Sequence, residues 1–184
     1  MLRLAVEAIR RGAIVGLPTD TVYGLAVDPF NGRAVADLHR LKGRPGGKPI
    51  ALLVGSLEAA STLGLFNEQA VDLAGRHWPG PLTIVVRTLV GLPEWVGDGI
   101  ASTVGIRYPD HETARDLLRE TGPLAVTSAN LARCDPAIDE VEARAIFGEA
   151  VAVYLEGKGG GLASTVVDST GPDIRVLRAG PLEL

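Results

Sequence analysis

The chain has 184 residues, about the size of one domain, and 46% of them are hydrophobic, enough to bury a substantial core. Its formal net charge of −4 argues against a general nucleic-acid or membrane-surface binder, because such proteins are usually basic. A single cysteine excludes an internal disulfide and a multi-cysteine zinc site, and no signal-peptide core or long apolar run is present. We therefore expect a cytoplasmic protein that does not associate with membranes.

Helical and strand patterns alternate along the chain. The amino-terminal segment predicts a helix whose apolar face carries Leu4, Ala5, Ala8 and Ile9. Two further helices are predicted around residues 35–41 and 114–118. Short apolar runs predict strands at 13–17, 50–54, 83–86, 104–107, 124–127, 151–155, 165–168 and 175–178.

This alternation predicts an α/β fold of the α+β type, with helices packed on a sheet. The last three predicted strands follow one another without a helix, so we expect a mixed parallel and antiparallel sheet. No shift in composition divides the chain, and residues 1–184 are predicted to form one domain. The glycine-rich stretch 157–161 is expected to be a flexible loop.

Several common catalytic motifs are absent. The segment GRPGGKP (43–49) resembles a phosphate-binding P-loop, but its spacing is one residue short and proline follows the lysine. The sequence contains no H-E-x-x-H and no G-x-S-x-G, which excludes the usual metalloprotease and hydrolase signatures.

Five segments combine polar or cationic residues with turns or strand ends, and each has both a structural and a functional interpretation. A glycine-rich cationic loop suits a polyphosphate, although it could equally be a solvated surface loop. Arg107, on a strand face opposite Val104 and Ile106, could hold a carboxylate or form a structural salt bridge. The segments are PTDTVYGL (18–25), KGRPGGKP (42–49), TVGIRYPD (103–110), LAVTSAN (124–130) and STVVDSTGPDIRVLRAG (164–180).

Taken together and in this order, the motifs closely resemble the YrdC family of threonylcarbamoyl-AMP synthases. The resemblance spans residues 5–181. It implies a single three-layer domain around a twisted, mixed sheet with a concave cleft. The matching motifs are PTDTVYGL (18–25), KGRPGGKP (42–49), WPGPLT (78–83), VGIRYP (104–109), SAN (128–130), STVVD (164–168) and RAG (178–180).

The resemblance also implies roles for individual residues. Lys42 and Arg44 would act on the phosphates of ATP and contribute to catalysis. The other ATP-binding positions would be Thr103, Ser128, Asn130 and Arg178. The threonine-binding positions would be Thr19, Tyr23, Arg107 and Ser164. Magnesium would enter with ATP, and no protein metal site is expected.

The implied reaction joins L-threonine, bicarbonate and ATP, and releases pyrophosphate. Its product would pass to separate proteins that transfer the threonylcarbamoyl group to tRNA, and tRNA binding by this chain would be weak at most. One departure from the family pattern is clear, because Ala132 and Arg133 replace the usual Ser-Gly after SAN. Three other interpretations are weighed, namely an RNA-binding module without catalysis, an accessory carbamoyl-transfer domain and a degenerate family member with only a structural role.

Overall fold

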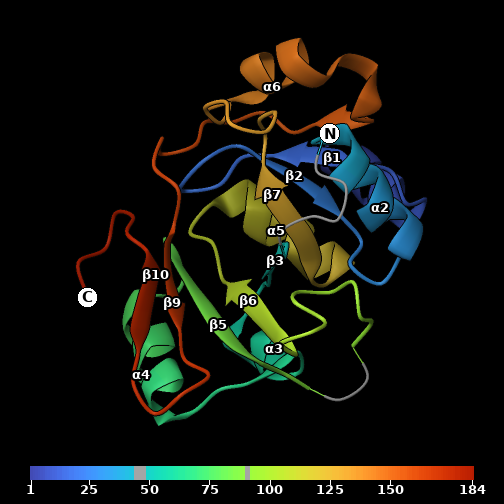
Figure 1. Cartoon of the computed structure of the whole chain (residues 1–184). Helices are drawn as coiled ribbons and strands as arrows, with labels where there is room; N and C mark the ends of the chain where they lie inside the picture. Colours follow the sequence, from blue (N-terminus) through green and yellow to red (C-terminus); the bar gives the residue numbers. More distant parts are fainter. Residues whose placement is uncertain (44–48, 90–91) are drawn as a thin grey trace.

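The structure is a computed structural model that describes residues 1–43, 49–89 and 92–184 (Figure 1). In these residues the strands form one sheet in the order β10–β9–β5–β6–β3–β7–β2–β1–β8, with β4 paired to β5 outside that path. The strands are β1 (Val15–Leu17), β2 (Gly24–Val27), β3 (Ala51–Leu53), β4 (Gly64–Leu65), β5 (Leu82–Thr88), β6 (Thr103–Arg107), β7 (Leu124–Ser128), β8 (Val153–Tyr154), β9 (Thr165–Asp168) and β10 (Arg175–Arg178). The helices are α1 (Leu2–Arg10), α2 (Gly32–Leu41), α3 (Leu57–Ser61), α4 (Glu68–His77), α5 (Glu112–Thr121), α6 (Glu140–Phe147) and the 3₁₀ helix η1 (Gly148–Ala150).

The mixed sheet predicted from the sequence is confirmed. The pairs β1–β8, β3–β6 and β5–β9 are parallel, whereas β1–β2, β2–β7, β3–β7, β4–β5, β5–β6 and β9–β10 are antiparallel. Figure 1 shows β9 and β10 at one end of the sheet and β1 and β2 at the other. Among the described residues, every helix is too short or too polar to cross a bilayer.

Helices cover both faces of the sheet, which gives three layers. Helices α1 and α5 pack on one face, in a cluster with Ala26 of β2 and Leu53 of β3. Helices α2, α3, α4 and α6 contribute to a second cluster, which includes Leu25, Val27 and Leu52 from the same two strands. Because successive strand residues point to opposite faces, each of these strands is buried on both sides.

Helix α1 forms where the sequence predicts it, but its buried face differs by one residue. Ala5, Val6, Ala8 and Ile9 are buried, whereas Leu4 is about half exposed. The prediction for Leu4 was therefore wrong. The buried residues still recur at helical spacing, so the amphipathic pattern holds.

Side-chain caps define where four of the helices begin. Asn31, Ser56, Asn67 and Asp139 each accept a hydrogen bond from a backbone N–H in the first turn of the helix that follows. Such caps satisfy backbone donors that have no partner inside the helix. The cap at Asn31 matters most for the site, because α2 leads directly into Lys42.

Candidate functional site

A pocket of about 340 Å³ lies on the sheet face that carries α1 and α5. Its floor includes Gly24 of β2, Ala51 of β3 and Val126 of β7. Each of these residues lies two positions along its strand from a member of the α1–α5 cluster, so it points to the same face. The volume lies within the usual range for small-molecule sites, about 300–1,000 Å³.

Five of the ten residues implied by the family resemblance line this pocket. They are Thr19, Arg107, Ser128, Ser164 and Arg178. They come from four segments that are far apart in the sequence, and the folded sheet brings them together. The structure therefore places these five residues around one pocket.

Arg107 is the most constrained side chain of the pocket. It is 5% exposed, and its Nε donates to the carbonyl oxygen of Gly80 at 3.0 Å. Its Nη1 donates to Thr21 Oγ1 at 2.6 Å, and its Nη2 forms an ion pair with Asp20. The structural salt bridge is thus present, and Arg107 also lines the pocket. Burial lowers the pKa of Arg107 and the Asp20 carboxylate opposes that shift, but an arginine stays charged throughout.

Asp20 links this pair to the start of α5. Its Oδ1 also accepts a hydrogen bond from the backbone N–H of Asp110 at 3.0 Å. Asp20 Oδ2 and His111 Nδ1 are both buried and have no hydrogen-bond partner within the described residues. Burial lowers the pKa of His111, against an opposing effect of Asp20, so the neutral imidazole is favoured there.

Arg178 and Ser164 form a second polar group on the pocket wall. Arg178 donates to the Ser164 carbonyl oxygen from Nε at 3.0 Å and from Nη2 at 2.8 Å. Nη2 also lies 3.0 Å from Ser164 Oγ, and that hydroxyl is 2.8 Å from Thr83 Oγ1. Burial lowers the pKa of Arg178, and its charge acts unfavourably on Arg107. Two arginines in one pocket create a local preference for an anionic ligand.

Lys42, Ser128 and Asn130 form a third group. Lys42 Nζ donates to the Ser128 carbonyl oxygen and to Asn130 Oδ1, the latter at 2.8 Å. The Ser128 hydroxyl donates to the same Asn130 oxygen at 2.6 Å. The structure therefore brings together three residues that the resemblance places beside the phosphates. Arg44, the fourth, lies outside the described residues.

Tyr23 does not belong to the pocket. Its side chain is fully buried in the core, its hydroxyl donates to the Leu155 carbonyl oxygen at 2.7 Å, and burial raises its pKa. The interpretation that Tyr23 lines the threonine pocket was wrong. Thr103 is also absent from the pocket lining, since it begins β6 and lies about 13 Å from Arg107 on the same strand face.

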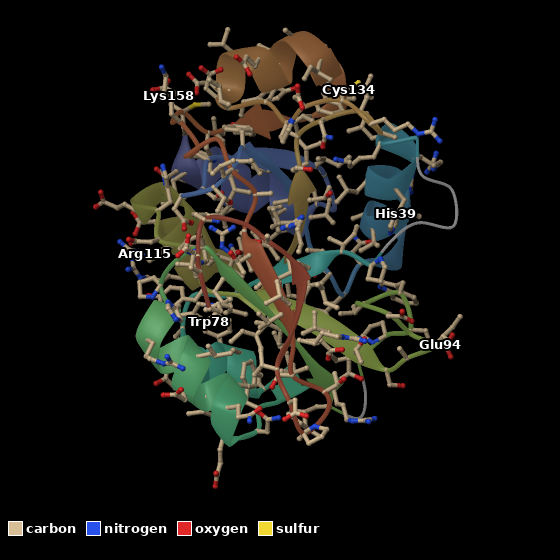
Figure 2. All side chains as sticks on the ribbon, turned by 60° about the vertical axis from the view of Figure 1, so that its left-hand side comes forward. His39, Trp78, Glu94, Arg115, Cys134 and Lys158 are labelled. Atoms are coloured by element: carbon tan, nitrogen blue, oxygen red, sulfur yellow. The ribbon has the colours of Figure 1, made fainter. Side chains whose placement is uncertain are left out.

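The loop after SAN keeps an unusual backbone at the position where the sequence departs from the family pattern. Arg133 has a φ of 70°, a left-handed conformation that normally favours glycine. This is the position that the family usually fills with glycine. The loop is held by Asn130 Nδ2, which donates to the Cys134 carbonyl oxygen at 2.6 Å. Figure 2 shows Cys134 at the end of the molecule that carries α6.

The sequence also suggests a hydroxyl from Thr21 around the amino-acid pocket, and Thr21 does line it. Two other polar residues of the site had no role in the sequence-based assignment. Thr83 lines the pocket, and Asp20 pairs with Arg107 behind it. Both lie inside quoted motifs, in WPGPLT and PTDTVYGL, and this was the only signal that could have identified them.

No carboxylate lines the pocket, and the described residues contain no group of three or more His, Cys, Asp or Glu side chains that could hold a metal ion.

Comparison with protein families gives one match over most of the chain. The family model for Sua5, YciO and YrdC, which carries the description "Telomere recombination", matches residues 7–180.

Individual relatives agree with this match. A protein of Mycobacterium tuberculosis is 43% identical over 181 residues, which cover 97% of this chain and 83% of that protein. A threonylcarbamoyl-AMP synthase of Pseudomonas syringae is 35% identical, over 96% of this chain and 95% of the relative. The solved structure of Pyrococcus abyssi Sua5 with L-threonine has a TM-score of 0.93 and 34% identity. That match covers 98% of this chain but 54% of the Pyrococcus chain, so this chain spans about half of that relative's length.

Proposed function

The chain belongs to the Sua5/YciO/YrdC family, and we propose that it makes L-threonylcarbamoyl-AMP from L-threonine, bicarbonate and ATP, with release of pyrophosphate. One observation carries the proposal for this chain. Two arginines and several hydroxyl groups, from segments far apart in the sequence, surround a single pocket. Such a pocket suits a reaction whose participants carry carboxylate, carbamate and phosphate charge.

The reaction needs no covalent enzyme nucleophile. Bicarbonate takes up a proton and loses water to give CO2. The neutral amine of threonine adds to the CO2 carbon and releases one proton, which leaves a carbamate. A carbamate oxygen then attacks the α-phosphorus of ATP, the bond to the bridging oxygen breaks, and pyrophosphate leaves. The protein's contribution is to position the reactants and to stabilise the developing charge.

The threonine side of the proposal uses Arg107 and Ser164, with Thr19 at the edge of the same pocket. Arg107 is held by Gly80, Thr21 and Asp20, so its guanidinium is fixed before any ligand binds. A fixed guanidinium suits a carboxylate, because little reorganisation is needed on binding. Ser164 accepts a hydrogen bond from Arg178, which belongs to the ATP side of the proposal.

The ATP side of the proposal uses Lys42, Ser128, Asn130 and Arg178, with Arg44 and Thr103 added by the family resemblance. A magnesium ion bound to the triphosphate would neutralise phosphate charge. Lys42 is anchored on Ser128, which itself lines the pocket, so its charge lies next to the proposed phosphate site.

The proposed cellular role follows from the product. Separate proteins would transfer its threonylcarbamoyl group to an adenosine next to the tRNA anticodon, and the cytoplasm is the proposed location. An RNA-binding module without catalysis is disfavoured, because the relatives are named as synthases and the net charge is −4.

The test is the reactant requirement. Pyrophosphate release from ATP is expected only when threonine and bicarbonate are both present. An enzyme that forms an aminoacyl-adenylate would need threonine alone. Full activity in degassed, bicarbonate-free buffer would contradict the proposal.

A further inference from the structure

The directions of the hydrogen bonds around Thr19 and Thr21 can be worked out from the acceptors involved. Thr19 Oγ1 lies 2.7 Å from the Val22 carbonyl oxygen, which can only accept, so the Thr19 hydroxyl proton points there. The two threonine hydroxyls are 3.0 Å apart, so Thr21 must donate to Thr19. Thr19 Oγ1 also accepts from the Thr21 backbone N–H at 3.2 Å. The Thr19 hydroxyl therefore has no capacity left for a ligand.

Thr21 differs from Thr19 in this respect. Its hydroxyl proton is committed to Thr19, and one lone pair accepts from Arg107 Nη1 at 2.6 Å. One further lone pair remains, on a residue that lines the pocket. The backbone of Thr21 is also held, because Gly161 donates its N–H to the Thr21 carbonyl oxygen at 2.6 Å. Thr21 Oγ1 therefore presents a fixed hydrogen-bond acceptor to the pocket, and it has no proton left to donate there.

From this geometry we infer that Thr21 Oγ1 accepts a hydrogen bond from the α-nitrogen of the amino-acid substrate. The inference rests on the proposed function, with Arg107 holding the substrate carboxylate. In an α-amino acid the carboxylate and the nitrogen share one carbon atom. A carboxylate on Arg107 therefore brings the nitrogen close to the hydroxyl that Arg107 itself contacts.

Thr21 Oγ1 can accept a hydrogen bond from the substrate nitrogen at every stage of the proposed reaction. The ammonium, the neutral amine and the carbamate of threonine each carry at least one N–H. A substrate with an N-methyl group loses its last N–H once the carbamate forms. Thr21 would then face a group that cannot donate, and the site should discriminate against such substrates.

The experiment is a cycle of two proteins and two substrates, with pyrophosphate release as the measurement. Wild type and Thr21→Val are each assayed with threonine and with N-methylthreonine. The N-methyl group should lower the kcat/KM of wild type at least tenfold. Part of this loss is steric and part comes from the unpaired Thr21 hydroxyl, and the second part should be absent in Thr21→Val. Because the steric effect of the methyl group is present in both proteins, the ratio of the two effects isolates the hydrogen bond.

Control variants show whether the discrimination belongs to the Thr21 hydroxyl. Thr21→Ser retains that hydroxyl and should keep the discrimination, whereas Thr121→Val removes a threonine hydroxyl far from the pocket and should match wild type. Thr21→Ala replaces Thr21→Val if the latter does not fold. A third substrate, 2-aminobutyrate, lacks the side-chain hydroxyl of threonine but keeps the N–H.

Each outcome decides the inference. The inference is overturned if wild type has the same kcat/KM for N-methylthreonine and threonine. It is also overturned if Thr21→Val discriminates between these two substrates as strongly as wild type does. It is also overturned if Thr21→Val changes kcat/KM for threonine but not for 2-aminobutyrate. The Thr21 hydroxyl would then act on the side-chain hydroxyl of the substrate and not on its α-nitrogen. Failure of wild type to release pyrophosphate with threonine would instead contradict the proposed function itself.

Discussion

Arg107 is 5% exposed, and the carboxylate of Asp20 lies against its guanidinium. Removing one partner of a buried ion pair usually costs much more than the pair itself contributes, because the remaining charge stays buried without compensation. Nearby Arg178 adds a second positive charge that disfavours the charged form of Arg107, so the compensating negative charge of Asp20 becomes more important. At the scale of single residues, Asp20 should therefore affect stability as well as the site.

We predict that Asp20→Asn lowers the free energy of unfolding by about 3 kcal/mol. The amide keeps the shape of the side chain but removes the charge that faces Arg107. Urea denaturation followed by the fluorescence of Trp78 and Trp95 would measure the change. Asp37→Asn is the matched control, since its pair with Arg40 is exposed and should contribute less than about 1 kcal/mol. Equal effects of the two substitutions would contradict the prediction.

The sequence identified several site residues correctly as members of motifs, but it could not show which way each side chain points. Thr19, Ser128 and Ser164 do line the pocket. Tyr23 belongs to the same motif as Thr19, yet it shares a core cluster with Leu25 and Val27. These three residues alternate along the chain, so the period of a strand explains their common face. The strand at 24–27 was not predicted, so this parity could not be applied to Tyr23.

At the scale of elements, strands that are continuous apolar runs were predictable and shorter or more polar ones were not. The predicted strands at 83–86 and 165–168 correspond closely to β5 and β9. Strands β2 and β4 and helices α3, α4 and α6 were missed. Strand β2 begins with a glycine inside a motif that resembles a turn, and its stability comes from pairing with β1 and β7. Such tertiary pairing overrides local propensity.

The glycine-rich segment 157–161 forms a loop, as predicted, and its backbone is bonded to two other segments of the chain. Gly159 and Gly161 donate backbone hydrogen bonds to Ile138 and Thr21. A Cβ atom on Gly160 would lie 2.4 Å from the Asp20 carbonyl oxygen. The glycines therefore allow two backbone segments to approach closely, and the loop supports residues 19–22 from behind. Figure 2 shows Lys158 of this segment near α6, which agrees with the bridge between Lys158 and Asp139.

We predict that Gly160→Ala lowers kcat/KM for pyrophosphate release by roughly 100-fold, since a backbone shift of about 1 Å can misplace reacting groups to that extent. The contact is with main-chain atoms, which cannot move aside as a flexible side chain would. Gly171→Ala is the control, because no atom lies within 4 Å of the added Cβ there and the activity should be unchanged. An effect of less than about threefold at Gly160 would show that the loop is not needed for the site.

At the scale of the whole molecule, the order of the strands in the sheet brings the pocket residues together. That order could not be predicted from local sequence patterns. The last three strands are consecutive in the chain, yet β8 pairs with β1 at one end of the sheet and β9 with β5 near the other. This separation places Ser164 and Arg178 beside Thr83. Pairing between segments so far apart depends on the packing of both faces, which local patterns do not record.

The overall charge of −4 sets the expected behaviour toward tRNA. The cations of the pocket are few and largely occupied by hydrogen bonds to the protein, such as those of Arg107 with Thr21 and Asp20. Contacts with a phosphate backbone release counterions, so any binding that rests on them weakens as salt is raised. An acidic protein with a small cationic pocket should therefore bind tRNA weakly and through electrostatics alone.

We predict a dissociation constant for tRNA weaker than about 1 µM at about 150 mM salt, in the range of non-specific binding. Fluorescence anisotropy with labelled tRNA, repeated between about 50 and 200 mM salt, would measure both the affinity and its salt dependence. An unrelated RNA hairpin should bind equally well, since phosphate contacts carry no sequence information. Tight binding that persists at high salt and distinguishes tRNA from the hairpin would contradict this expectation. In that case the pocket would have to be reconsidered as part of an RNA-recognition surface.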